Sequence, residues 1–557
     1  MVKHCAGLPL AIVVLGGILA TKISLDEWKR VSENVKSYMN RSRGQGTMQV
    51  LALSYDDLPA YLRPCFLYLS HYPEDYVIEA QRLIELWVAE GIVSSKEEGD
   101  ADGEWGVAED VAEHYIMELA ARCMIQPRDR DVATFKVKTF QLHDEMRFLC
   151  LSKAKQDNFL FIVDESNARS SSTLRKIRRI SALKFFETQR IECPNLRSLS
   201  FFNTNYLYEL FEVGTPSACE IGPFSRLSCF WDILAAYIRF LRARGFWVYI
   251  FTNLKLLRVL NYEGLLTYSG CMLIGDIGNL IHLRFLSLNK LKIKGSKLPS
   301  SLGNLRCLQT LDLRLRGSKE IEVPDVIWRM EQLRHLYLPY RCDEKTKLQL
   351  GTLRNLLTLV NFNTKNCYLK DLSNMTNLRE LTIYGHFKME GFNELDENPP
   401  IIQAKYLHSL TISREEEIDP RHLNHLLSSC ASICNLTLDV KIPKLPELRY
   451  LSSNLTHIWL VSCKLGEDPM PTLELLPNLR VLELYYDAFR GNKMTCSAQG
   501  FPKLESLSLK YHYFLEQWEV DEGAMPCLGR LEITDCSHLD MGPLRQRFNK
   551  ILKERIN

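Results

Sequence analysis

The chain has 557 residues, of which 46% are hydrophobic and 24% are charged, an ordinary balance for a soluble protein. Lysine and arginine outnumber aspartate and glutamate by only 69 to 67, so the bulk charge favours neither nucleic acid, nor an anionic membrane, nor an acidic substrate. The length exceeds that of one compact core, and several domains are therefore expected.

The first twenty residues are apolar. Met1-Val2-Lys3-His4 precedes a run from Cys5 to Ala20 that has the outline of a secretory signal peptide. Pro9 and the Gly16-Gly17 pair interrupt this run, no small-residue cleavage site ends it, and it is short for a membrane span. We therefore favour a helix of the folded protein over a leader.

Helical spacing dominates the next hundred residues. Apolar periodicity predicts helices over 50–58, 61–69, 78–90 and 107–124, with Gly91 as the terminating glycine of the third. Period-two alternation predicts a strand over 134–142, preceded by a charged turn at 129–131. Helices closed by a hairpin make a winged-helix unit.

A winged helix can read DNA, but the helix over 78–90 argues against it. Glu79, Glu85 and Glu90 outnumber the single Arg82 there, and carboxylates repel a phosphate backbone. The basic run Arg175-Lys176-Ile177-Arg178-Arg179 has two interpretations. It is either a nuclear-targeting cluster or, as we prefer, a strand that leads into the next domain with Ile177 and Ile180 inward.

A Leu-x-x-Leu-x-Leu-like hexad recurs through the last two-thirds of the chain. Its central residue lies at 260, 286, 311, 336, 359, 381, 410, 436, 458, 482, 507 and 531, a spacing of 22 to 29 residues. This is the period of leucine-rich repeats, in which each hexad is a short strand with its leucines inward. Such units stack into a curved solenoid with a broad face suited to protein binding.

The outward positions of the hexads are candidates for partner contact, because exposed Trp, Tyr and Arg dominate binding hot spots. The alternative is that scattered exposed aromatics are normal on a protein surface. Phe285, Arg379, His457 and Tyr511 also occupy outward positions. The main candidates are Arg284, Arg334, His335, Tyr337, Trp459, Arg480 and Tyr485. Of these, Trp459, Arg480 and Tyr485 lie on neighbouring hexads and are expected to form one patch.

Several motifs, in order, resemble the plant intracellular immune receptors that join a nucleotide-binding switch to leucine-rich repeats, in the branch with an N-terminal coiled coil. Cys5-Ala6-Gly7-Leu8-Pro9-Leu10-Ala11 is similar to that family's GLPL motif. Residues 51–59, 65–70 and 83–91 are similar to its winged-helix domain. Gln141-Leu142-His143-Asp144 lies where the family has Met-His-Asp, with Leu142 in place of Met and Glu145 in place of an apolar residue.

The resemblance implies a nucleotide site. In the family, the histidine at the position of His143 contacts the terminal phosphate of ADP, and the proline at Pro9 packs on adenine. The residues carried over are Gly7, Leu8, Pro9, Leu10, Leu142, His143 and Asp144. Without the resemblance, His143-Asp144 indicates only that Asp144 helps to start a helix beside an ordinary histidine.

No phosphate-binding G-x-x-x-x-G-K-[ST] loop occurs in the sequence. We therefore expect a chain truncated at the GLPL motif, with vestigial nucleotide elements, no enzymatic activity and no bound ADP or ATP of its own. Oligomerisation is not expected without the family's preceding domains. The predicted fold is α+β multidomain: residues 1–45 a remnant of the nucleotide-binding region, 46–160 a winged-helix domain, 161–190 a linking strand, and 191–557 an α/β leucine-rich-repeat horseshoe.

The predicted function is recognition of a pathogen effector or a guarded host protein in plant defence. A non-immune scaffold for protein interactions and an incomplete gene model of an ATP/ADP-switched receptor are the alternatives. The 17 cysteines lack zinc spacing, so no metal site is predicted, and buried, reduced thiols in the cytoplasm are favoured over disulfides. Peripheral membrane or nuclear association remains open, but no integral membrane segment and no nucleic-acid partner are expected.

Overall fold

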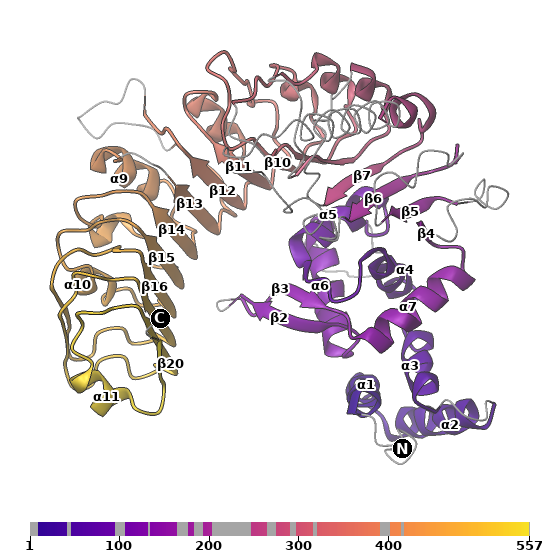
Figure 1. Ribbon diagram of the computed structural model, residues 1–557, viewed down its shortest axis with the longest axis horizontal. Coiled ribbons are helices and arrows are strands. Elements are labelled where there is room, and N and C mark those ends of the chain that lie inside the picture. The colour runs from indigo at the N-terminus through magenta and orange to yellow at the C-terminus, as the bar shows by residue number, and fades with distance from the viewer. Residues whose placement is uncertain are drawn as a thin grey trace, which may run out of the picture. The chain divides into compact units, whose positions relative to one another are not determined.

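The computed structural model describes residues 9–41, 46–94, 106–131, 134–163, 177–182, 193–202, 247–263, 275–289, 297–315, 320–389, 401–413 and 417–555 (Figure 1). The chain divides into two compact units. The first unit is Met1–Gly295 with Leu315–Gly317, and the second is Ser296–Arg314 with Ser318–Asn557.

Three helices begin the first unit: α1 (Pro9–Ala20), α2 (Leu25–Arg41) and α3 (Gly46–Asp56). The apolar run is thus a packed helix over its described residues, as predicted. The three helices share a small core of buried side chains, made by Ala11, Leu15, Ile18, Val31, Val35 and Leu53.

The next elements form a helical group with a small antiparallel sheet of strand order β1-β3-β2, which confirms the winged-helix prediction. Leu83, Trp87 and Phe140 are fully buried at the centre of its core. The elements are α4 (Leu62–Tyr68), β1 (Ile78–Glu79), α5 (Ala80–Glu90), α6 (Ala108–Ala121), β2 (Gln126–Arg130), β3 (Val137–Gln141) and α7 (Asp144–Gln156).

Two local predictions in this domain have opposite outcomes. Gly91 ends α5 with φ of 78°, in the left-handed region that favours glycine, as predicted. The prediction of a charged turn at 129–131 is wrong, because these residues mostly belong to β2, which pairs with β3. The chain reverses after it, where the Asp131 carboxylate accepts hydrogen bonds from the backbone N–H and hydroxyl of Thr134. Charged side chains misled the prediction because β2 is an exposed edge strand.

In the part of the first unit that the structure describes, the winged helix is followed by five parallel strands: β4 (Phe161–Val163), β5 (Arg179–Ala182), β6 (Ser198–Phe202), β7 (Val259–Glu263) and β8 (Phe285–Ser287). Ile180, Leu199, Leu260 and Leu286 face one another in register across β5 to β8. Ile177 and Ile180 are buried as predicted, so the basic run contributes a repeat strand.

The second unit continues the repeat. In every adjacent pair from β9 to β20 the central hexad residues face each other in register, as with Leu336 between Leu311 and Leu359. The predicted hexads are therefore the strands. These are β9 (Thr310–Asp312), β10 (His335–Tyr337), β11 (Thr358–Phe362), β12 (Glu380–Tyr384), β13 (Ser409–Ser413), β14 (Asn435–Asp439), β15 (His457–Val461), β16 (Val481–Tyr485), β18 (Ser506–Lys510), β20 (Arg530–Thr534) and β21 (Leu552–Arg555).

The strands of the second unit line one face, while short helices and a two-stranded ladder lie behind them (Figure 1). The leucines of the hexads are completely buried between these layers, as with Leu482 and Leu507. The outer elements are α9 (Pro420–Ser428), α10 (Met470–Leu473), α11 (Gly542–Phe548) and the parallel pair β17 (Lys493–Cys496) and β19 (Gln517–Val520).

Candidate functional site

The residues of the proposed nucleotide motifs lie at two helix starts. Pro9 is the first residue of α1 and is exposed, and Leu10 packs partly against the winged-helix core, which includes Leu142. Gly7 and Leu8 lie outside the described residues. The two motifs thus share one apolar cluster through Leu10 and Leu142.

His143 has a structural task at the start of α7. It is the N-cap residue, and its ring Nδ1 accepts a hydrogen bond from the backbone N–H of Glu145 at 3.3 Å. Asp144 is the first helical residue, where a carboxylate interacts favourably with the helix dipole. Asp144 therefore helps to start the helix as predicted, but His143 is not an ordinary histidine, because it supplies the cap.

An open hollow of about 460 Å³ lies beside Asp144. Glu74, Asp144 and Glu145 line it, with Arg147 as the single cation. The Arg147 guanidinium donates to the carbonyl of Tyr72, so part of its hydrogen-bonding capacity is already used. Three carboxylates against one guanidinium make this hollow unsuited to phosphate groups.

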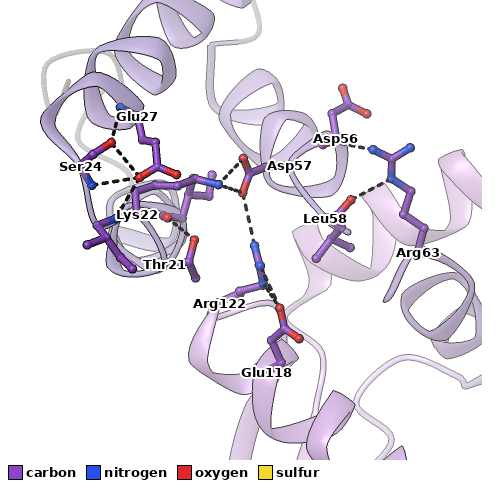
Figure 2. Close-up of polar contacts among 12 residues, drawn as sticks. Thr21, Lys22, Ser24, Glu27, Asp56, Asp57, Leu58, Arg63, Glu118 and Arg122 are labelled. Carbon is purple, nitrogen blue, oxygen red and sulfur yellow. Dashed lines mark hydrogen bonds and ion pairs between the residues drawn. The ribbon is translucent and has the colours of Figure 1, made fainter. Parts of the chain in front are cut away.

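A polar network joins the N-terminal helices to the winged helix (Figure 2). Asp57 binds Lys22 at 2.9 Å and Arg122 at 3.3 Å, and Arg122 also pairs with Glu118 at 2.8 Å. Helix α1 approaches α6 so closely that a Cβ on Gly17 would lie 2.5 Å from the carbonyl oxygen of Arg122. This network could not be predicted from sequence patterns, because its members are up to a hundred residues apart.

The winged helix is bound to the first repeat strands by the two ends of α5. Near its start, the Arg82 guanidinium donates to the Asn261 side chain at 2.9 Å and lies over the Phe285 ring at 4.5 Å. At its end, the Glu90 carboxylate pairs with Arg179 at 3.0 Å, and its side chain is almost completely buried. Phe285, an outward hexad position, is therefore fully covered within the first unit.

Buried polar groups accumulate in this same region. His71 packs against Tyr68, with ring centroids 4.3 Å apart and ring planes tilted by 31°, and neither of its ring nitrogens has a hydrogen-bond partner among the described residues. Burial, and to a lesser degree the charge of Arg179, lowers the pKa of His71 to about 3, so the imidazole is neutral. The contact between winged helix and repeats is thus partly polar and not a continuous apolar core.

The strand face of the second unit has an uneven charge pattern. In β12 to β16 the charged residues are Glu380, Asp439 and Glu483, and these five strands contain no lysine or arginine. Glu483 belongs to a row that is otherwise rich in hydroxyls, in which Thr382, Thr411 and Thr437 lie in register with Trp459 and Glu483. Burial raises the pKa of Glu483, an effect that Lys510 opposes.

An aromatic patch, defined as Trp459, Tyr485, Tyr486 and Tyr511, begins on the last two of these strands and continues just beyond β16 and β18. The rings of Trp459 and Tyr485 meet edge to face at 5.6 Å, and those of Tyr486 and Tyr511 stack at 4.8 Å. Trp459 is 36% exposed and Tyr486 is 53% exposed. Exposed, mutually packed aromatic rings of this kind are typical of binding hot spots.

Backbone strain marks two members of the aromatic patch. Tyr486 and Tyr511 directly follow β16 and β18 with φ of 56° and 59°, a conformation that costs a bulky residue of order 1 kcal/mol or more. After β12 the same place is taken by Gly385, with φ of 84°. The same place is taken by Ser462 after β15 and by Asp535 after β20, with φ of 50° and 53°, so the repeat accepts smaller residues where the two tyrosines stand.

The other partner-contact candidates divide. His335 and Tyr337 are buried, at 2% and 7% exposure, which contradicts their prediction as contact residues. The His335 ring lies 3.2 Å from the Thr358 hydroxyl, and the Arg314 guanidinium covers the Tyr337 ring at 4.3 Å. Neighbouring repeats thus supply the contacts that had been expected from a partner.

Three arginine candidates are half-buried: Arg284, Arg334 and Arg480. Arg480 pairs with Glu505 at 3.4 Å. It precedes β16, whereas Tyr485 ends that strand, so the two lie roughly 17 Å apart at 3.3 Å per residue. Arg480 therefore does not belong to the aromatic patch.

All thirteen cysteines that the structure describes are free thiols, and eight of them are buried, among them Cys65 and Cys150. Cys307 is exposed, although its apolar neighbours predicted burial. Within the described ranges, no group of three or more His, Cys, Asp or Glu side chains could hold a metal ion. No helix in that same part of the chain is long and apolar enough to cross a membrane.

Two family models match the chain. One describes a leucine-rich repeat region and covers residues 245–550, and the other describes a disease resistance protein winged helix domain and covers residues 72–150. These matches fall on the two kinds of domain that the fold contains.

Similar full-length proteins come from Arabidopsis thaliana. "Probable disease resistance protein RF9" is 38% identical over 98% of this chain and 49% of its own length, and "Disease resistance protein RPH8A" is 36% identical over 100% and 57%. The chain thus spans about half the length of the curated relatives it matches. A solved leucine-rich-repeat protein of Leptospira interrogans, LIC12759, aligns with 71% of this chain and 99% of its own, with 15% identity and a TM-score of 0.32, too low to support an argument.

Proposed function

The chain belongs to the leucine-rich-repeat family and is a homologue of plant disease resistance proteins with a winged-helix domain, and from this we propose that its repeats recognise a protein in plant defence. The partner is a pathogen effector or a host protein that the receptor guards. The observation that carries the proposal is the exposed aromatic patch beside the acidic strands β12 to β16.

The charges of this face indicate what kind of protein it would bind. Glu380, Asp439 and Glu483 are the charged residues of β12 to β16. A partner surface with lysine or arginine would complement them, and its cations could also lie over the Trp459 ring. We therefore propose a basic partner surface, recognised in the cytoplasm, where free thiols such as those of this chain persist.

Replacing Tyr486 by asparagine should separate binding from folding. Asparagine tolerates the left-handed backbone, so Tyr486→Asn should leave the melting temperature unchanged or raise it, while partner binding falls. Trp459→Ala should also lose the partner, at a stability cost of about 1 kcal/mol or less. The measurement is capture from infected and healthy leaf, quantified by mass spectrometry, with melting followed by circular dichroism.

The matched control for this capture is Trp328→Ala. Trp328 is 37% exposed, similar to Trp459, but lies outside the aromatic patch. Proteins enriched from infected leaf should be retained by the Trp328 variant and lost by the other two. Retention of every such protein by both patch variants would exclude the aromatic patch as the recognition site.

The nucleotide elements have a lesser role in our proposal. His143 caps α7, the neighbouring hollow is acidic, and the sequence contains no phosphate-binding loop. The chain should therefore show no ATP turnover. Calorimetric titration should show no ADP binding at micromolar affinity, because such affinity requires a binding free energy of about 8 kcal/mol. A micromolar or tighter dissociation constant would show that Pro9 and His143 still form a working pocket.

A further inference from the structure

Four arginines occupy the same hexad position in four neighbouring strands of the first unit. Arg178, Arg197, Arg258 and Arg284 each follow the first apolar residue of a hexad. Backbone hydrogen bonds place them side by side, since Arg197 donates to Arg178 at 2.8 Å, Arg258 to Arg197 at 2.7 Å, and Arg284 to Arg258 at 2.7 Å. We call this row the arginine ladder.

The spacing of the arginine ladder brings like charges together. Neighbouring strands are about 4.8 Å apart, so the four residues span roughly 14 Å. Burial, then repulsion from Arg258, Arg178 and Arg179, lowers the pKa of Arg197, in agreement with the spacing that the backbone sets. Like charges directly opposite each other on a sheet are destabilising. The row therefore needs a source of negative charge.

The protein supplies only part of that charge. The carbonyl of Glu90, at the negative end of α5, accepts a hydrogen bond from Arg258 at 3.4 Å, and a helix end carries only about half a charge. The Arg284 guanidinium also approaches this helix end, 3.6 Å from where a Cβ on Gly91 would lie. The Glu90 carboxylate is already paired with Arg179. Within the described residues, no carboxylate forms an ion pair with any of the four arginines.

We propose that the arginine ladder is a binding site for a small anion that carries several phosphate groups. One guanidinium group can donate two parallel hydrogen bonds to two oxygens of a phosphate group. Successive phosphate groups of one compact molecule can therefore each bind one of a row of arginines spaced about 5 Å apart. Arg178 is exposed and the other three are half-buried, so the row can be reached from solvent and is partly desolvated. The ladder is separate from the aromatic patch, and its test is independent of partner capture.

A small anion fits better than nucleic acid. Nucleic-acid surfaces combine a long basic track with aromatic side chains on which bases stack. This row is only four residues long, and the overall charge of the chain is close to neutral. One polyphosphate molecule is sufficient to balance it.

Calorimetric titration of the full chain with inorganic tripolyphosphate at low salt tests the proposal. The unmodified chain should bind, and Arg197→Gln with Arg284→Gln should weaken binding at least tenfold. Arg197→Lys keeps the charge but loses paired hydrogen bonding, and should weaken binding about threefold to tenfold. The matched control is Arg421→Gln with Arg449→Gln, two exposed arginines paired with Asp419 and Glu447, which should bind as the unmodified chain does.

Melting without ligand gives a second readout. Removing an arginine from a repelling row should leave the melting temperature unchanged or raise it, whereas tripolyphosphate should raise that of the unmodified chain but not of the double variant. Absence of tripolyphosphate binding to the unmodified chain would overturn the proposal, as would equal binding by the double variant. A twelve-nucleotide RNA that binds more than tenfold tighter than tripolyphosphate through the same arginines would overturn the choice of a small anion.

Discussion

Glu90→Gln is expected to destabilise the first unit by about 3 kcal/mol, because it leaves a buried guanidinium without its carboxylate. The Glu90 side chain is almost completely buried and pairs with Arg179, which is itself mostly buried. The change also removes a carboxylate whose attraction opposes the lowering of the pKa of Arg197. Denaturant unfolding of the full chain, followed by circular dichroism, measures the loss.

Two control variants show whether the loss belongs to the ion pair. Glu447→Gln removes an exposed carboxylate that pairs with Arg449 at 3.0 Å, and should cost about 0.5 kcal/mol or less. Combining Glu90→Gln with Arg179→Gln removes both buried charges and should recover most of the stability. Equal losses from Glu90→Gln and Glu447→Gln would show that the winged helix does not depend on this contact.

Leu482→Ala is expected to cost roughly 2 to 5 kcal/mol and to loosen the neighbouring repeats. Leu482 is completely buried, and it faces Ile458 on one side and Leu507 on the other. A stack of repeats is stabilised by contacts between neighbours, so a cavity in one repeat weakens the next. Hydrogen exchange of the β15, β16 and β18 amides measures this loss locally.

Val481→Ala is a matched control for Leu482→Ala. Val481 is the preceding residue of the same strand and is also largely buried, but it does not belong to the leucine row. Because valine is smaller than leucine, Val481→Ala should lower the free energy of unfolding by only about 1 kcal/mol. Similar exchange rates in the two variants would argue that the leucine row is not what joins the repeats.

The repeat strands could be predicted from the sequence because one physical rule fixes them. Each leucine hexad needs its apolar residues on the inner side, so the spacing determines both the strands and their register, as with Leu482 and Leu507. The strand centred on Leu199 was missed. Its hexad is regular, but Leu199 precedes Leu260 by 61 residues. This separation exceeds the repeat period, so the pattern of regularly spaced hexads did not include it.

The sites were harder to predict because they depend on contacts between distant parts of the chain. A side chain that points away from the leucine core is not always exposed to solvent. The Phe285 ring is covered by Arg82 from α5, and the Tyr337 ring is covered by Arg314. Trp459, Arg480 and Tyr485 were predicted to form one patch. The ring distance of 5.6 Å confirms this for Trp459 and Tyr485, and the prediction is wrong for Arg480. Tyr486 was not predicted as a contact residue. The alternation of side chains along a strand does not predict the direction of the residue with left-handed backbone that follows the strand.

Hydrogen–deuterium exchange of the full chain, with and without a captured partner, tests the central claim most directly. Recognition through the aromatic patch predicts that added protection is concentrated in the peptides that carry β15, β16 and β18, together with Tyr486 and Tyr511. The variant Tyr486→Asn should bind the partner weakly and show little of this protection at the same concentration. Full protection elsewhere in the chain, with these peptides unchanged, would contradict recognition by the strand face.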